Sequence, residues 1–277
     1  MLARFFAFLA GASLIGSYAA AEVRQPTGAW SVGITGNECL LTRPYGNAKQ
    51  PLFLAFSKAP MSSGLDMVVL RPSTNADLRH GPAFVRPDAQ PAIDRKFYAS
   101  LLRVNPSTGL KVNTMRRIWI GVPDDAYAAL KSAQQLSVDA DKEVKEQFLL
   151  GDFPEALRRL DECTVRLGEK WGYPGEEQHR ISTPAKPVEG LDNLFSGDDY
   201  PRAALRDETM GRVRVKIPVS ATGQATDCQI VAGSGSVDLD AATCRIILSR
   251  AKFEPAIDVD GKAVRSVYVE TIQWLLI

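Results

Sequence analysis

A strictly alternating segment near the C-terminus places the strongest constraint on the fold of this chain. In "GRVRVKIPV", residues 211–219, hydrophobic residues occupy every second position and basic residues stand between them. Successive side chains of a β-strand point to opposite faces, so this pattern predicts a strand with one apolar and one basic face. We expect the basic face to be solvated, although contact with an acidic partner is the alternative. The basic residues are Arg212, Arg214 and Lys216.

The residues that follow complete a small α+β unit. A turn around Gly223 leads to a second strand, "TDCQIVAGS", at 226–234. The next segment, 237–253, begins with acidic residues and ends with basic ones, as the helix dipole favours. A turn at Asp260-Gly261 then precedes a final strand over 265–277. A helix that packs on one face of such a hairpin and strand gives a compact α+β fold.

The final strand contains a conflict of parity. Its hydrophobic residues lie at odd positions before Glu270 and at even positions after Thr271, so a regular strand would send them to opposite faces. The predicted helices cover only one face, and we therefore expect a β-bulge near Glu270-Thr271. The alternative is that both faces are covered. The residues concerned are Val267 and Val269, then Ile272, Trp274 and Leu276.

Several short motifs in this region resemble the TonB C-terminal domain family. They are Tyr200-Pro201, "GRVRV" from Gly211, Gly223, "SGSVDLDAA" at 234–242, "FEPA" at 253–256, and Gly261 before the terminal strand. Their order and spacing cover residues 197–277. The resemblance implies a three-stranded antiparallel sheet with two helices, facing the periplasm. It also implies binding of the TonB box of outer-membrane receptors by strand addition, and transmission of energy from an inner-membrane motor complex.

The terminal strand is the expected peptide-binding edge. An open sheet edge can pair with an extended peptide through its backbone groups. Pro218 lacks an N–H, so it must stand at a strand end or where its nitrogen points away from the pairing. The predicted edge residues are Glu270, Thr271, Ile272, Gln273, Trp274 and Leu275.

The N-terminus has the layout of a secretory signal. Arg4 precedes a short apolar run from Phe5 to Leu14, and small residues follow at 19–21. A spanning helix needs about 20 apolar residues, so residues 1–21 are predicted to be a cleaved signal peptide, and the protein is expected in the periplasm. The alternative is a retained inner-membrane anchor, which would restore an anchored energy transducer.

Sequencing the N-terminus of the mature protein tests this expectation. We expect the chain to begin near Glu22 and to be recovered as a soluble periplasmic protein. Recovery of Met1 on protein embedded in the inner membrane would contradict signal cleavage.

The rest of the chain divides into a β-rich domain at 22–173 and a linker at 174–196. Strand-like runs separated by Gly, Pro and Asn extend to Val122, where Arg116 and Arg117 are expected on the polar side of a strand. Residues 126–136 and 155–171 then space their apolar residues by three and four, which predicts closing helices. The segment 174–196 is rich in Pro, Gly and charge without a period, which is typical of a linker.

Four cysteines fit an oxidising compartment. They allow three disulfide pairings, and four buried thiols remain the alternative. Cys228 falls on a predicted strand and Cys244 on the following helix, so we expect these two to pair. Cys39 and Cys163 would then join the start of the β-rich domain to its end.

The composition and motifs favour a binding protein over an enzyme. A net charge of +1 provides no attraction to nucleic acid. Two histidines far from the cysteines, without a Cys-x-x-Cys motif, give poor support for a metal, and no cofactor is expected. The expected partner is a TonB-box-like peptide of an outer-membrane receptor, and a homodimer stays open. The alternative function is a ligand-binding or enzymatic N-terminal domain with the TonB-like domain as an adaptor.

Overall fold

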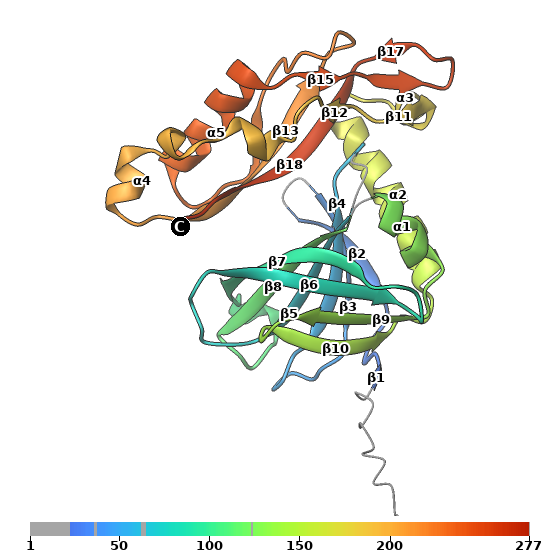
Figure 1. Ribbon diagram of the computed structural model, residues 1–277. Coiled ribbons are helices and arrows are strands. Elements are labelled where there is room, and N and C mark those ends of the chain that lie inside the picture. The colour runs from blue at the N-terminus through green and yellow to red at the C-terminus, as the bar shows by residue number, and fades with distance from the viewer. Residues whose placement is uncertain (1–22, 36–37, 62–64, 123, 277) are drawn as a thin grey trace, which may run out of the picture.

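The hydrophobic residues gather into two separate cores. The computed structural model describes residues 23–35, 38–61, 65–122 and 124–276. One core lies between Trp30 and Leu167, and the other between Ala185 and Trp274. Figure 1 shows the first as a half-barrel and the second as a smaller unit above it. We call them the N-terminal unit, residues 23–173, and the C-terminal unit, residues 174–276.

The N-terminal unit is built on one strongly curved sheet. Its strands in spatial order are β1 (Val23–Arg24), β10 (Val144–Leu149), β9 (Gln135–Ala140), β6 (Arg79–Pro87), β7 (Ile93–Arg103), β8 (Thr114–Val122), β5 (Leu65–Pro72), β4 (Phe53–Lys58), β3 (Glu38–Pro44) and β2 (Ser31–Thr35). Neighbouring strands are antiparallel except for β1 and β10. Alternate residues, such as Ile118 and Ile120 of β8, fill the interior of the half-barrel.

Two helices and a disulfide complete this unit. Helix α1 (Asp124–Lys131) is short, whereas α2 (Phe153–Lys170) runs along the side of the half-barrel and packs on β2 and β3. The buried face of α2 includes Phe153 and Leu157. Cys163 of α2 is joined to Cys39 of β3, so the disulfide fixes the helix to the sheet as the sequence predicts.

The sequence interpretation of the region after Val122 needs correction. The helix predicted over 126–136 ends at Lys131, and Leu136 belongs to β9. Residues 135–140 alternate buried and partly exposed positions, which is the period of a strand rather than of a helix. Strands β9 and β10, and not helices alone, therefore close the β-rich unit.

The C-terminal unit has α+β architecture. Strand β13 (Gly211–Val219) lies between β14 (Gln229–Ala232) and β18 (Ser266–Trp274) in an antiparallel sheet. Helices α4 (Arg202–Arg206) and α5 (Val237–Arg250) accompany this sheet, and Figure 1 shows both on the same side of it. Helix α5 buries Leu239, Ile246 and Ile247 against the apolar face of β13. Short 3-10 turns occur in this unit at Leu191–Leu194 (η2) and Gly197–Asp199 (η3), and in the N-terminal unit at Pro106–Thr108 (η1).

The segment expected to be a linker is folded into the C-terminal unit. It contains α3 (Gly175–Arg180), and Ala185 and Leu191 lie in the C-terminal core. The segment is held by backbone pairing with other strands rather than by a periodic apolar face. Because its sequence has no hydrophobic period, it resembled an unstructured linker. The pairs are β11 (Ile181–Thr183) with β16 (Ala256–Asp258), β12 (Lys186–Pro187) with β15 (Phe253–Glu254), and β16 with β17 (Ala263–Val264).

The second disulfide offers a test of stability. Cys228 and Cys244 are joined, and their separation of 16 residues ties the start of β14 to α5. Loop-closure entropy predicts that replacing both residues by serine lowers the free energy of unfolding by about 3 kcal/mol. Denaturant titration of the oxidised wild type and the double variant measures the difference. An unchanged midpoint would show that the bridge does not stabilise the unit.

Candidate functional site

Strand β18 forms an open edge of the C-terminal sheet. It pairs with β13 from Ser266, opposite Val219, to Trp274, opposite Gly211. Among the strands that the structure describes, no other pairs with β18, and Figure 1 shows it on the outside of its sheet. An unpaired edge presents N–H and C=O groups that can bind another extended chain.

Pro218 determines which residues of β18 face outward. The carbonyl of Pro218 accepts a hydrogen bond from the Thr226 N–H at 2.9 Å, so its backbone faces away from β18. Pro218 stands opposite Val267, and this pair is therefore a non-hydrogen-bonded pair of the β13–β18 ladder. Because such pairs alternate along an antiparallel ladder, every second residue of β18 directs its N–H and C=O outward. These residues are Val267, Val269, Thr271 and Gln273.

The Glu270 side chain already accepts a hydrogen bond from one of the outward-facing N–H groups. Its Oε1 accepts a hydrogen bond from the Thr271 N–H at 2.9 Å, and its Oε2 accepts one from the Tyr268 hydroxyl at 2.9 Å. Burial raises the pKa of the Glu270 carboxyl above its usual range. A peptide that pairs with this edge must therefore replace the Glu270 side chain at the Thr271 N–H.

The edge opens onto a cavity between the two units. This cavity has a volume of about 370 Å³ and extends along residues 268–271 of β18. Pro184 and Ala185 line it from the C-terminal unit, while Asp66 and Trp119 line it from the N-terminal unit. Side chains of a peptide at the edge would thus meet walls from both units.

Acidic groups of the N-terminal unit bind the basic face of β13. Arg214 forms an ion pair with Asp66 of β5 and a second, at 3.2 Å, with Glu38 of β3. The Arg214 side chain is only 13% exposed. Burial raises the pKa of Glu38, and the charge of Arg214 opposes that rise.

Aromatic side chains cover the other two basic residues of this face. The Arg212 guanidinium lies over the Trp119 ring at 4.2 Å, and the Lys216 ammonium lies over the Trp171 ring at 4.4 Å. The expectation that this face is solvated is therefore wrong. The partners lie in the same chain, on strands and a helix end more than forty residues away in sequence, which is why β13 alone did not reveal them.

The comparisons with known proteins bear on this unit. Residues 197–276 match the family model described as Gram-negative bacterial TonB protein C-terminal. This part of the chain is a TonB C-terminal domain. A search of curated proteins found no match for the chain. The TonB C-terminal family consists of binding and transduction domains rather than enzymes, and the N-terminal unit lies outside the match.

The match indicates a TonB-like role in the periplasm, in energy transduction or in the binding of envelope proteins. The predicted signal peptide, residues 1–21, lies outside the described residues. Across the part of the chain that is described, no helix has the length and apolarity needed to cross a membrane.

The bulge expected in the last strand of the TonB C-terminal domain does not occur. The register of β18 against β13 continues without a shift through residues 270 and 271. Ile272 and Trp274 pack in the domain core, where the Trp274 Nε1–H donates to the Thr243 hydroxyl at 2.9 Å. Val267 lies on the opposite face and is 2% exposed. Both faces of β18 are thus covered, because the N-terminal unit supplies the second cover.

The regular register divides the predicted edge segment, residues 270–275. Thr271 and Gln273 direct their backbone groups outward, whereas the even-numbered residues turn theirs to β13. Leu275, the last residue of the segment, lies beyond the end of β18 at Trp274. Val267 and Val269 also face outward but lie outside the predicted segment. The sequence alone could not identify them, because the pairing of Pro218 with Val267 is known only from the structure.

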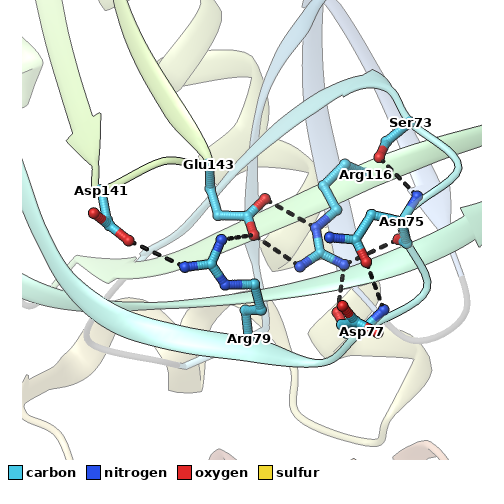
Figure 2. Close-up of polar contacts among 7 residues, drawn as sticks. All are labelled: Ser73, Asn75, Asp77, Arg79, Arg116, Asp141 and Glu143. Carbon is cyan, nitrogen blue, oxygen red and sulfur yellow. Dashed lines mark hydrogen bonds and ion pairs between the residues drawn. The ribbon is translucent and has the colours of Figure 1, made fainter.

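A second polar cluster lies inside the N-terminal unit (Figure 2). Arg116 of β8 points into the half-barrel and is 1% exposed, which corrects its expected place on a polar face. Its guanidinium donates to both carboxylate oxygens of Glu143 at 2.8 and 2.9 Å. It also donates to the carbonyls of Asn75 and Asp77 at 3.2 and 2.6 Å. These contacts fix the segment that precedes β6 over one end of the half-barrel.

The charges of this cluster are balanced within it. Arg79 forms ion pairs with Glu143 at 3.4 Å and with Asp141 at 3.1 Å (Figure 2). Hydrogen bonds from Arg116 lower the pKa of the Glu143 carboxyl below its usual range. A carboxylate that is ionised and shared by two arginines is poorly suited to accept a proton or bind a further cation, so we assign the cluster a structural role.

Proposed function

We propose that this protein captures an extended peptide of an outer-membrane receptor, or of another envelope protein, by adding it as a strand to β18. This binding would serve energy-dependent transport across the outer membrane, with the mature protein in the periplasm. The observation that carries the proposal is the outer edge of β18, where alternate backbone groups are directed away from the TonB C-terminal sheet.

The geometry of the edge supports this kind of recognition. In strand addition, main-chain hydrogen bonds provide affinity and pockets for alternate side chains provide specificity. Val267, Val269, Thr271 and Gln273 supply the outward main-chain groups. The cavity along residues 268–271 supplies a place for side chains of the peptide. The bond from Thr271 to Glu270 competes with the peptide, which favours a reversible complex.

Amide exchange at single residues tests the pairing directly. Peptides captured by the mature protein from envelope extracts are first identified by mass spectrometry and then synthesised. On binding, we expect amide exchange to slow at Val267, Val269 and Gln273, whose N–H groups face outward. The amides of Tyr268 and Ile272 already pair with β13 and serve as internal controls. Binding of a captured peptide without slower exchange at the outward amides would rule out strand addition at β18.

A further inference from the structure

Three arginines meet between the two units, but the two nearby carboxylates form ion pairs with only one of them. Asp66 and Glu38 both contact Arg214, as described above. Arg117 of β8 and Arg212 of β13 lie beside this group. Among the residues that the structure describes, no carboxylate lies within ion-pair distance of Arg117 or Arg212. Three guanidinium groups therefore share two carboxylates, and neither Arg117 nor Arg212 forms an ion pair with a described residue, although the charge of Glu38 acts on both.

The hydrogen-bond donors of these two arginines are largely unused. Arg117 makes one long hydrogen bond, from Nη2 to the Ser100 hydroxyl at 3.4 Å. The guanidinium carbon of Arg212 lies 4.2 Å from the centre of the Trp119 ring, and no described residue accepts a hydrogen bond from its Nε. The Nε atoms of both arginines are buried and have no hydrogen-bond partner in the described structure. Buried donors without partners are rare in folded proteins, and such donors at the wall of a cavity favour the binding of a polar group there.

The two charges also repel each other. Burial and the positive charge of Arg117 together lower the pKa of Arg212 to about 10, although the charges of Asp66 and Glu38 oppose the shift. Burial likewise lowers the pKa of Arg117. Both groups remain charged at neutral pH, so a bound anion would relieve their repulsion and satisfy their free donors together.

A cavity adjoins both guanidinium groups. It has a volume of about 390 Å³, within the range of small-ligand sites. Its other wall is formed by outward-facing residues of the N-terminal sheet; most are apolar, and Thr35, Glu38 and Ser57 are the polar ones. The apolar residues of that wall are Leu40, Ala55, Val68, Leu70 and Leu102. A charged end next to an apolar wall matches a ligand with an anionic head and an apolar body.

We propose that the cavity between the two units binds a small amphipathic oxyanion, an acid with a short alkyl body. Arg117 and Arg212 hold the head group, because the planar guanidinium fork matches the geometry of carboxylate and phosphate oxygens. The alkyl body lies against Leu40, Val68 and Leu70. One arginine comes from each unit, so the bound ligand joins the N-terminal unit to the TonB C-terminal domain.

Calorimetry with matched probes tests the proposed site. The mature protein is titrated with sodium octanoate, octyl phosphate, octanol, acetate and inorganic phosphate. We expect at least one of the two amphipathic anions to bind, with one ligand per chain, and to raise the unfolding temperature. Octanol lacks the charge, and acetate and phosphate lack the alkyl body, so each should bind about tenfold more weakly or worse. The comparison of octanoate with octyl phosphate identifies the preferred head group.

Charge-removing variants locate the binding site. Arg117→Gln and Arg212→Gln each remove one proposed head-group ligand, and each should weaken binding by about tenfold or more. Lys216→Gln is the matched control, because Lys216 lies on the same face of β13 but does not line the cavity. The unfolding temperature of each free variant shows that it folds.

Three results would each overturn the proposal. The first is the absence of binding by both amphipathic anions at millimolar concentration. The second is binding of octanol, acetate or phosphate as tight as that of the amphipathic anion. The third is binding by a folded arginine variant as tight as that by Lys216→Gln. The two arginines lie in different units, so failure of one variant to fold leaves the other as a test.

Discussion

Unfolding of the Glu143→Ala variant is expected to require about 3–5 kcal/mol less free energy than unfolding of the wild type. The loss follows from the surroundings of Arg116, which is 1% exposed and contacts both oxygens of Glu143. Without the carboxylate, the buried guanidinium keeps only carbonyl partners, at Asn75 and Asp77. An unpaired buried charge is among the largest single-residue penalties in a folded protein. Denaturant titration at neutral pH measures the change.

Two further variants separate this effect from an ordinary loss of an ion pair. Asp139→Ala removes the exposed pair with Lys145, at 3.2 Å, and should cost at most about 1 kcal/mol. The double variant Arg116→Met/Glu143→Leu should recover much of the loss, because no charge is then left buried. If Glu143→Ala costs no more than Asp139→Ala, the buried pair does not stabilise the half-barrel.

The contribution of Glu143 should depend on pH in a defined direction. Hydrogen bonds from Arg116 lower the pKa of this carboxyl in the folded state. A lowered pKa stabilises the folded state above the unfolded-state value, about 4.3 for glutamate, and this contribution is lost as the pH falls through the folded-state value. The stability difference between wild type and Glu143→Ala should therefore be full at neutral pH and shrink below about pH 4. A difference that stays constant into acid would contradict the assigned pKa shift.

Local patterns predicted the C-terminal unit better than the N-terminal one. The alternation of residues 211–219 and the acidic start and basic end of α5 each depend on neighbours in sequence, and both occur as expected. Residues 135–140 also alternate, but the apolar spacing of the preceding helix extended into them and hid the strand. Arg116 could not be placed, because its partner Glu143 is 27 residues away and belongs to a turn that the sequence did not reveal.

The candidate site likewise depends on contacts between residues far apart in the sequence, which local patterns do not reveal. The family motifs identified the domain and its last strand, but not what lies against them. Arg214 and Asp66 are separated by 148 residues, so no local pattern could indicate their contact. The sequence did not show that the N-terminal unit covers the second face of β18, and for that reason the bulge was predicted incorrectly. Pro218 indicates which residues of β13 turn away from the pairing, but only the register in the structure places Val267 opposite it.

Proline substitutions on β18 should abolish peptide capture while the fold is retained. Val269→Pro and Gln273→Pro each remove an outward N–H that does not pair with β13. Proline is tolerated on edge strands at such positions, so the antiparallel ladder to β13 should survive. Binding of a captured envelope peptide should fall below detection in both variants. Calorimetry with that peptide measures affinity, and the unfolding midpoint measures retention of the fold.

Variants at the same edge control for the side chains and for Glu270. Val269→Ala and Gln273→Ala keep the backbone N–H, so each should change peptide affinity little. Glu270→Ala frees the Thr271 N–H from its carboxylate partner, and we expect peptide binding to become severalfold tighter. Strand addition requires the proline and alanine variants to differ at each position, because only the proline removes a main-chain donor. Normal capture by folded proline variants would show that the peptide binds to another surface of the domain.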